Sequence, residues 1–119
     1  MRMTDQSEPQ KSISLSVGEI NALKKAILYL KFSCEDAGVD IFASSSLINS
    51  AFENLLKASD LGEMELKFYQ KGNRGNEEYV ISRIKQMESR DGDVMSEDLK
   101  MRVYEAWMYP FRLTNNSDK

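Results

Sequence analysis

The amino-acid sequence predicts a mainly α-helical protein, with four or five helices packed as a small bundle and one short N-terminal β-strand. Two patterns carry the helical part of this prediction. Apolar residues recur every three or four positions in several separate stretches, which is the period of an amphipathic helix. Most of these stretches follow a serine or asparagine, residues that cap helix N-termini. The strand is predicted from the alternation of polar and apolar residues at 12–17.

Length and composition predict one folded domain with short polar ends. A chain of 119 residues is long enough for one hydrophobic core, and 41% apolar with 29% charged residues is ordinary for a globular protein. Residues 1–11 are polar and contain Pro9, so we expect a disordered arm there. We therefore place a single helical domain at residues 12–113 and a disordered polar tail at residues 114–119.

The first helix is predicted to begin directly after the strand. Ser16 and Glu19 have the spacing of a capping box, in which each side chain accepts a hydrogen bond from the other residue's backbone N–H. Gly38 is expected to close this helix. The expected core stripe consists of Ile20, Leu23, Ile27 and Leu30. The other side is expected to carry Glu19, Lys24, Lys25 and Lys31.

A second helix is predicted after the connection that follows Gly38. The serines at 44–46 offer N-caps, and the helix is expected to end between Lys57 and Asp60. Its apolar stripe consists of Leu47, Ile48, Ala51, Phe52, Leu55 and Leu56. The apolar residues of the connection are expected to tuck into the core, namely Val39, Ile41 and Phe42.

The second half of the chain contains one ambiguous stretch and two clear helices. Residues 63–71 alternate like a strand, but Gly72 after them is typical of a helix end, and we favour a helix. Asn76 and Ser96 are expected to cap the two clear helices. Gly92 and Pro110 are expected to end them.

The composition excludes several familiar kinds of catalysis. The chain has no histidine and a single cysteine, Cys34, so it cannot build a His-based triad, a Cys-His pair or an ordinary zinc cluster. We therefore expect no enzyme activity, no metal and no cofactor. A net charge of −3 argues against broad attraction to nucleic acid or anionic lipid. Without a secretory signal or a long apolar run, we expect a cytoplasmic protein that does not enter a membrane.

The densest aromatic cluster of the chain lies around Trp107, near the C-terminus. If Trp107 faces inward, its aromatic neighbours cannot all face inward from the same helix end, so part of the cluster is expected to be exposed. Tyrosine and arginine are typical of binding hot spots. The predicted partner-binding residues are therefore Tyr104, Met108, Tyr109, Phe111 and Arg112. The alternative is an aromatic plug that closes a small core.

Residues 11–58 resemble the ribbon-helix-helix family of DNA-binding proteins. The resemblance lies in the serines that alternate with apolar residues ahead of a helix, and in the second helix that opens on the serines at 44–46. In that family a short strand pairs with the same strand of a second chain. The outward residues of this ribbon enter the major groove of DNA, and the N-terminus of the second helix holds a phosphate.

The resemblance implies a DNA-binding site as the alternative to a protein-binding site. It implies that Ser12, Ser14 and Ser16 face base edges and that backbone N–H groups near Ser45 meet a phosphate. Lys11 would lie on the same side, together with Lys24 and Lys25. The same residues also fit a strand at a sheet edge followed by serine helix caps.

The function that these observations favour is that of a non-catalytic interaction protein, which binds and modulates a macromolecular partner. Small inhibitors, immunity proteins and assembly factors are proteins of this kind. An acidic chain favours a basic protein partner. A lone strand also needs a neighbour, which predicts a homodimer. The alternative is a dimeric regulator of ribbon-helix-helix type that binds DNA.

Overall fold

The structure of the protein is a computed structural model that describes residues 8–114. Its elements in chain order are α1 (Val17–Phe32), the 3₁₀ helix η1 (Ala37–Val39), α2 (Asp40–Ala43), α3 (Ser46–Lys57), α4 (Gly62–Gln70), α5 (Arg74–Asp91) and α6 (Glu97–Met108). The prediction of a mainly helical protein is confirmed over this range. The disorder expected at residues 1–7 and 115–119 lies outside it.

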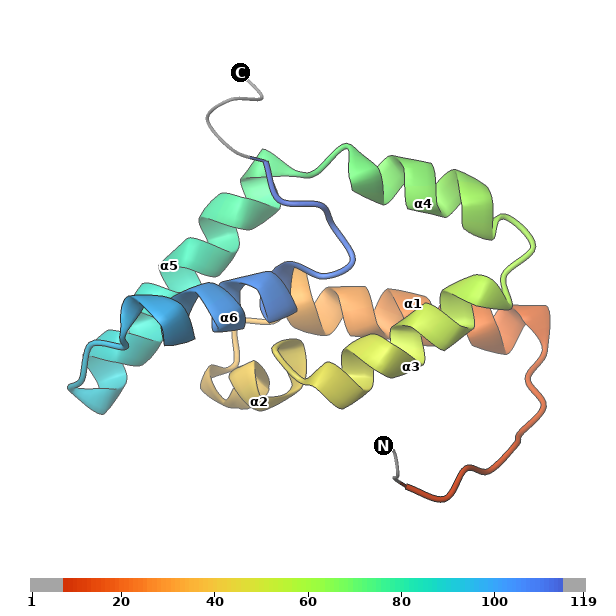
Figure 1. Cartoon of the computed structure of the whole chain (residues 1–119), viewed down its shortest axis with the longest axis horizontal. Coiled ribbons are helices and arrows are strands. Elements are labelled where there is room, and N and C mark those ends of the chain that lie inside the picture. Colours follow the sequence, from red (N-terminus) through yellow and green to blue (C-terminus); the bar gives the residue numbers. More distant parts are fainter. Residues whose placement is uncertain (1–7, 115–119) are drawn as a thin grey trace.

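The expected N-terminal strand is wrong for the described chain. No strand occurs between residues 8 and 114, and Val17 already belongs to α1. A strand requires a neighbouring strand for its backbone hydrogen bonds. The backbone of residues 9–15 forms no such bond with any other described residue. The alternating residues therefore form an irregular segment that leads away from the start of α1 (Figure 1).

The described helices also outnumber the four or five that were expected. The additional α-helix is α2, a single turn that directly continues η1. The sequence pattern treated this stretch as an apolar connection, because one turn is too short to show a helical period. Of its expected core residues only Val39 is buried, whereas Ile41 and Phe42 are exposed.

The predicted helix starts are largely confirmed, and the first one has its full capping box. The N–H of Glu19 donates to Ser16 Oγ at 3.1 Å, and the N–H of Ser16 donates to Glu19 Oε1 at 2.8 Å. Ser45 caps α3 and Ser96 caps α6 as expected. The cap of α5 is Asn73 instead of Asn76, so this helix begins one turn earlier than predicted.

The helix ends follow the glycines only in part. Gly92 ends α5 with a φ of 79°, a left-handed conformation that favours glycine. Gly38 does not close α1, which already ends at Phe32, and it lies in η1 instead. The ambiguous stretch at residues 63–71 is helical, which confirms the preferred reading.

The core lies where α1, α3, α5 and α6 meet. In Figure 1, α1 runs through the middle of the molecule, α3 crosses it, and α5 packs along α6. Helix α4 spans from the end of α3 to the start of α5 (Figure 1). The buried apolar residues of this core are Val39, Ala43, Phe52, Leu56, Tyr69, Val80, Ile84, Trp107, Met108 and Phe111. Among the helices of residues 8–114, none has the length and apolarity to cross a bilayer.

Helix α1 does not place its lysines as the sequence pattern predicted. Lys24 and Lys31 are buried, at 4% and 1% exposure, whereas Leu23 of the expected core stripe is 44% exposed. The helix therefore turns a stripe that contains two lysines toward the core. Both ammonium groups donate to hydrogen-bond acceptors, which replace the water that burial removes from them.

Candidate interaction surfaces

The C-terminal aromatic cluster mainly closes the core. Met108 is 0% exposed and Phe111 is 9% exposed. The ring of Phe111 meets the edges of Tyr69 and Phe32, with ring centroids 5.0 and 5.3 Å apart. Burial raises the pKa of Tyr69 to about 12, with a smaller contribution from the carboxylate of Glu65. The structure thus places Met108 and Phe111 in the aromatic plug that the sequence offered as the alternative.

The other three predicted partner-binding residues do not share one surface. Tyr104 lines a groove between α5 and α6, whereas Tyr109 lines a groove between α3 and α4. Arg112 is exposed on the segment that follows α6, and its N–H donates to the carbonyl of Tyr69 at 3.0 Å. Any contact with a partner through Tyr104 is therefore separate from a contact through Tyr109.

The segment after α6 is anchored by a buried carboxylate of α5. The N–H and hydroxyl of Thr114 both donate to Glu77, with shortest distances of 2.7 Å. Glu77 is 7% exposed, so these bonds satisfy a carboxylate that has lost most of its water. Gly72 lies against this segment with a φ of 75°, where an added Cβ would meet the Arg112 carbonyl oxygen at 2.9 Å. The sequence predicts that Thr114 belongs to the disordered tail, whereas in the structure these hydrogen bonds hold it against the domain.

Lys31 is the most buried charged residue of the described chain. Its Nζ donates to the carbonyl oxygens of Ala43 and Ala106 at 2.8 Å and of Trp107 at 3.2 Å. These carbonyls lie at the C-terminal ends of α2 and α6, where the helix dipoles favour a cation. Burial lowers the pKa of Lys31 to about 7. The Trp107 indole N–H completes the centre by donating to the Lys31 carbonyl at 2.6 Å.

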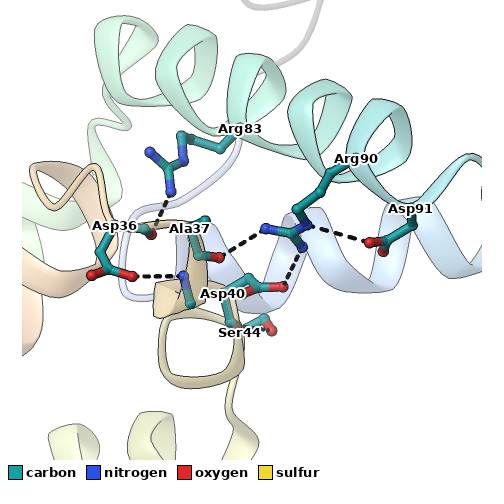
Figure 2. Close-up of polar contacts among 8 residues, drawn as sticks. Asp36, Ala37, Asp40, Ser44, Arg83, Arg90 and Asp91 are labelled. Carbon is teal, nitrogen blue, oxygen red and sulfur yellow. Dashed lines mark hydrogen bonds and ion pairs between the residues drawn. The ribbon is translucent and has the colours of Figure 1, made fainter.

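Two arginines of α5 hold η1 and α2 against the rest of the molecule. Arg83 donates to the Asp36 carbonyl at 2.8 Å, and Arg90 donates to the Ala37 carbonyl at 2.9 Å (Figure 2). Arg90 also pairs with Asp40 at 3.5 Å. Arg83 is 7% exposed, so its contact is shielded from water, whereas the side chain of Arg90 is 44% exposed. Both arginines have a structural role here.

An apolar groove lies between α1 and α3, and the N-terminal segment forms part of its wall. The groove has a volume of about 500 Å³. Its lining is Ile13, Leu15, Ile20, Leu23, Ile27, Ala51, Asn54, Leu55 and Ala58. None of these side chains is charged, and Ile13 is 79% exposed. This groove, called here the α1–α3 groove, is a large apolar surface that no other part of the described chain covers.

The residues of the alternative DNA-binding site lie mostly at the surface. Ser12, Ser14 and Lys11 are exposed. Ser16 is exposed as well, but its hydroxyl serves the capping box of α1. The hydroxyl of Ser45 accepts from the N–H of Ile48 at 3.2 Å and thereby caps α3.

The lysines expected on the DNA-facing side are separated by the fold. Lys25 is exposed, but Lys24 is buried. The Lys24 ammonium pairs with Glu65 and donates to Ser59 Oγ, at 2.6 Å each. Lys24 is therefore not available to a phosphate group.

Sequence reasoning missed the buried charges, although one signal was present. Ile20, Lys24, Ile27 and Lys31 are spaced by four, three and four residues, which is itself a continuous helical stripe. A lysine within such a stripe indicates either a long side chain that reaches solvent or an ammonium with buried acceptors. The acceptors of Lys31 are backbone carbonyls of residues 43, 106 and 107. The residues next to Lys31 in the sequence therefore do not indicate whether its ammonium group reaches solvent or is buried.

Comparisons of the chain with protein-family models, with curated proteins and with solved structures found no match.

Proposed function

We propose that this protein is a non-catalytic interaction protein that binds and modulates a macromolecular partner. The observation that carries the proposal is the α1–α3 groove, whose lining includes the exposed apolar residues Ile13 and Leu23. Concave sites lined mainly by apolar side chains are typical of binding sites in proteins. The absence of histidine from the whole sequence supports a role without catalysis, because the common acid-base and nucleophilic systems depend on it.

The first candidate partner for this groove is a second copy of the chain. Residues 9–15 have backbone groups without partners in the described chain, and their apolar side chains line the groove. Two such segments that pair with each other would satisfy both sets of backbone groups. They would also cover apolar surface on both copies. The proposal therefore includes a homodimer formed through residues 9–15 and the α1–α3 groove.

Light scattering across a dilution series tests the homodimer. The expected result is a mass of about twice 13.6 kDa at high concentration, which falls toward the monomer mass on dilution. A mass that stays at the monomer value up to millimolar protein would exclude the second copy. The groove would then have to bind a different protein.

Partner capture tests the wider proposal. The wild-type chain and a Leu23→Asp variant are used as paired baits in extracts of the source cells. A protein that the wild type captures, and that the variant loses, supports the proposal, because Leu23 is exposed and lines the groove. Asp98→Leu serves as a control outside the groove. Recovery of nucleic acid alone, with no specific protein, would overturn it.

One observation favours DNA as a second candidate partner. Ser12, Ser14 and Ser16 are exposed, and Lys11 adds an exposed positive charge beside them. A dimer formed through this segment would present both serine rows side by side. The second candidate is therefore a dimeric DNA-binding regulator of ribbon-helix-helix type.

A gel-shift titration at several salt concentrations separates this candidate from a protein binder. Specific DNA binding should weaken steeply as salt rises, and the double variant Ser12→Ala and Ser14→Ala should weaken it further. A Lys11→Gln variant should lower the salt dependence by about one released counterion per chain. Equal and weak binding by all variants would exclude a DNA site at these residues.

A further inference from the structure

A second groove lies between α3 and α4, and unlike the α1–α3 groove it is lined by charged residues. It has a volume of about 470 Å³, within the range of about 300 to 1,000 Å³ typical of ligand sites. Its apolar lining consists of Leu56, Leu61, Met64, Leu66 and Tyr109. Leu61 and Met64 are 62% and 65% exposed, so the apolar surface is open to a partner. We call this site the α3–α4 groove.

The rim of the α3–α4 groove is acidic. Glu53, Asp60 and Glu63 line it, and Lys57 is its only basic residue. Lys57 pairs with Glu53 at 3.6 Å, with both side chains more than half exposed. Asp60 and Glu63 have no ion-pair partner among residues 8–114. The groove therefore presents apolar surface beside two carboxylates that no basic side chain of the described residues neutralises.

The corner that forms this groove is held in place from within. Gly62 begins α4, and a Cβ there would lie 2.5 Å from the Leu56 carbonyl oxygen, so the close approach of α3 and α4 requires glycine. Lys24 of α1 binds Ser59 and Glu65 on either side of the turn, at 2.6 Å each. These partly buried contacts fix the corner without using the rim carboxylates. The site is thus preformed, which lowers the entropic cost of binding.

Tyr109 links the acidic rim to the end of α6. Its side chain is half-buried, and its ring meets Phe52 of the core edge-on, with centroids 6.3 Å apart. Burial and, to a smaller degree, the Glu53 carboxylate raise the pKa of Tyr109. Tyr109 therefore stays neutral near pH 7 and offers an apolar ring with a hydroxyl, a combination that is enriched at binding interfaces.

We propose that the α3–α4 groove binds a short basic amphipathic segment of a protein partner. Apolar side chains of the segment pack on Leu61 and Met64, and its lysines or arginines pair with Asp60 and Glu63. The charge complementarity selects a basic segment over an acidic one. This inference rests on the proposed function, because it specifies the chemistry of the macromolecule that the protein binds.

The test uses a fluorescein-labelled 14-residue peptide made of leucine and lysine in an amphipathic helical pattern. The fluorescence anisotropy of the peptide should rise and reach a plateau as the full chain is added, which shows saturable binding. A matched peptide with glutamate in place of lysine should bind at least tenfold more weakly. Shifts in ¹H–¹⁵N spectra on adding the basic peptide should cluster at residues 53–66 and at Tyr109.

Charge-matched variants separate the groove from general attraction to an acidic protein. Asp60→Asn with Glu63→Gln should weaken the basic peptide about tenfold. The control, Glu78→Gln with Asp93→Asn, removes the same charge at two other exposed positions and should change binding less than twofold. Met64→Ser should also weaken binding several-fold, because it removes apolar surface while it keeps the charge.

Three outcomes would overturn the inference. These are no saturable binding at millimolar peptide, equal losses for the rim and control variants, and spectral shifts that cluster away from residues 53–66. Its failure differs from a failure of the proposed function. If partner capture stays sensitive to Leu23→Asp while the basic peptide does not bind, only the α3–α4 groove is excluded. If the peptide binds but no protein partner is captured, the groove stands and the wider proposal fails.

Discussion

The two ends of α1 differ in how completely the molecule covers them. At its C-terminal end Lys31 and Trp107 are each 1% exposed, and the polar groups of the two residues bond to each other's backbone. At its N-terminal end Val17 and Leu23 are 58% and 44% exposed, and Ile13 of the preceding segment is 79% exposed. A single helix thus joins a closed, hydrogen-bonded centre to an open apolar surface.

This difference indicates a division of roles along one helix. The closed end supplies stability, because buried polar groups with complete hydrogen bonding fix a single packing arrangement. The open end leaves apolar surface in water, which costs free energy unless another molecule covers it. Substitutions at the closed end should therefore change folding, and substitutions at the open end should change association. The predictions below test this division.

The largest expected effect is that of Lys31→Met at the closed end. The change removes the ammonium donor of the Ala43 and Trp107 carbonyls and one of the two side-chain donors of the Ala106 carbonyl, at roughly 1 kcal/mol or more for each lost hydrogen bond. We expect the free energy of unfolding to fall by about 3 kcal/mol. Urea denaturation followed by circular dichroism measures it. Lys25→Met, on the exposed side of the same helix, should change stability by about 0.5 kcal/mol or less, and equal effects would contradict the division.

The arginines of α5 offer a smaller effect in the same region. Arg83→Ala removes a buried charged donor from the Asp36 carbonyl and should lower the free energy of unfolding by about 2 kcal/mol. Arg90→Ala removes contacts that are partly exposed to water, and about 0.5 kcal/mol is expected. Urea denaturation of both variants gives the comparison. A larger loss for Arg90→Ala would show that the contacts of Arg90 with Ala37 and Asp40, and not the shielded contact of Arg83, hold η1 and α2 in place.

Much of the fold follows from the sequence, because most helices carry local signals. Ser16, Ser45 and Ser96 cap their helices as predicted, and Gly92 ends α5. Each of these signals acts between residues that are close in the sequence, so the helix ends that they set can be predicted from the sequence. The expected strand failed for the opposite reason. Its alternation was real, but a strand also depends on a neighbour, and the described chain provides none.

The candidate surfaces were less predictable, because they depend on contacts between distant residues. The predicted aromatic site divided into buried residues, such as Met108, and two separate grooves at Tyr104 and Tyr109. The burial of Lys31 depends on carbonyls up to 76 residues away. No local pattern reports such a distance. The α1–α3 groove, in contrast, includes the stripe residues that sequence periodicity had already marked as apolar.

At the open end of α1, the double variant Ile13→Ser and Leu23→Ser should weaken self-association. Both side chains line the α1–α3 groove, and covering each of them would contribute about 1.5 kcal/mol or more. We expect the dissociation constant of the proposed homodimer to rise at least tenfold in light scattering. Both residues are exposed in the single chain. At protein concentrations too low for a dimer to form, the free energy of unfolding of the variant should therefore differ from that of the wild type by about 0.5 kcal/mol or less. A large loss of stability there would show that the open end belongs to the core.

The pH dependence of stability gives the finest test of the closed end. The pKa of Lys31 is about 7 in the folded protein, whereas its ordinary value, expected in the unfolded chain, is 10.5. Between these values the unfolded chain binds a proton that the folded chain does not. The Lys31 contribution to the free energy of unfolding should therefore rise from pH 7 to pH 9, by up to about 1.4 kcal/mol per unit. Below pH 7 both states carry the proton, and this contribution becomes constant.

Urea midpoints of the wild type and of Lys31→Met at pH 6, 7, 8 and 9 isolate this contribution. The wild-type curve should rise more steeply than that of the variant above pH 7. The three carbonyl acceptors favour the charged ammonium, which opposes the effect of burial and reduces the slope. Parallel curves would mean that these acceptors fully compensate for the lost water. Lys31 would then be a permanent cation that joins the C-terminal ends of α2 and α6, and the closed end of α1 would keep its charge across the whole range.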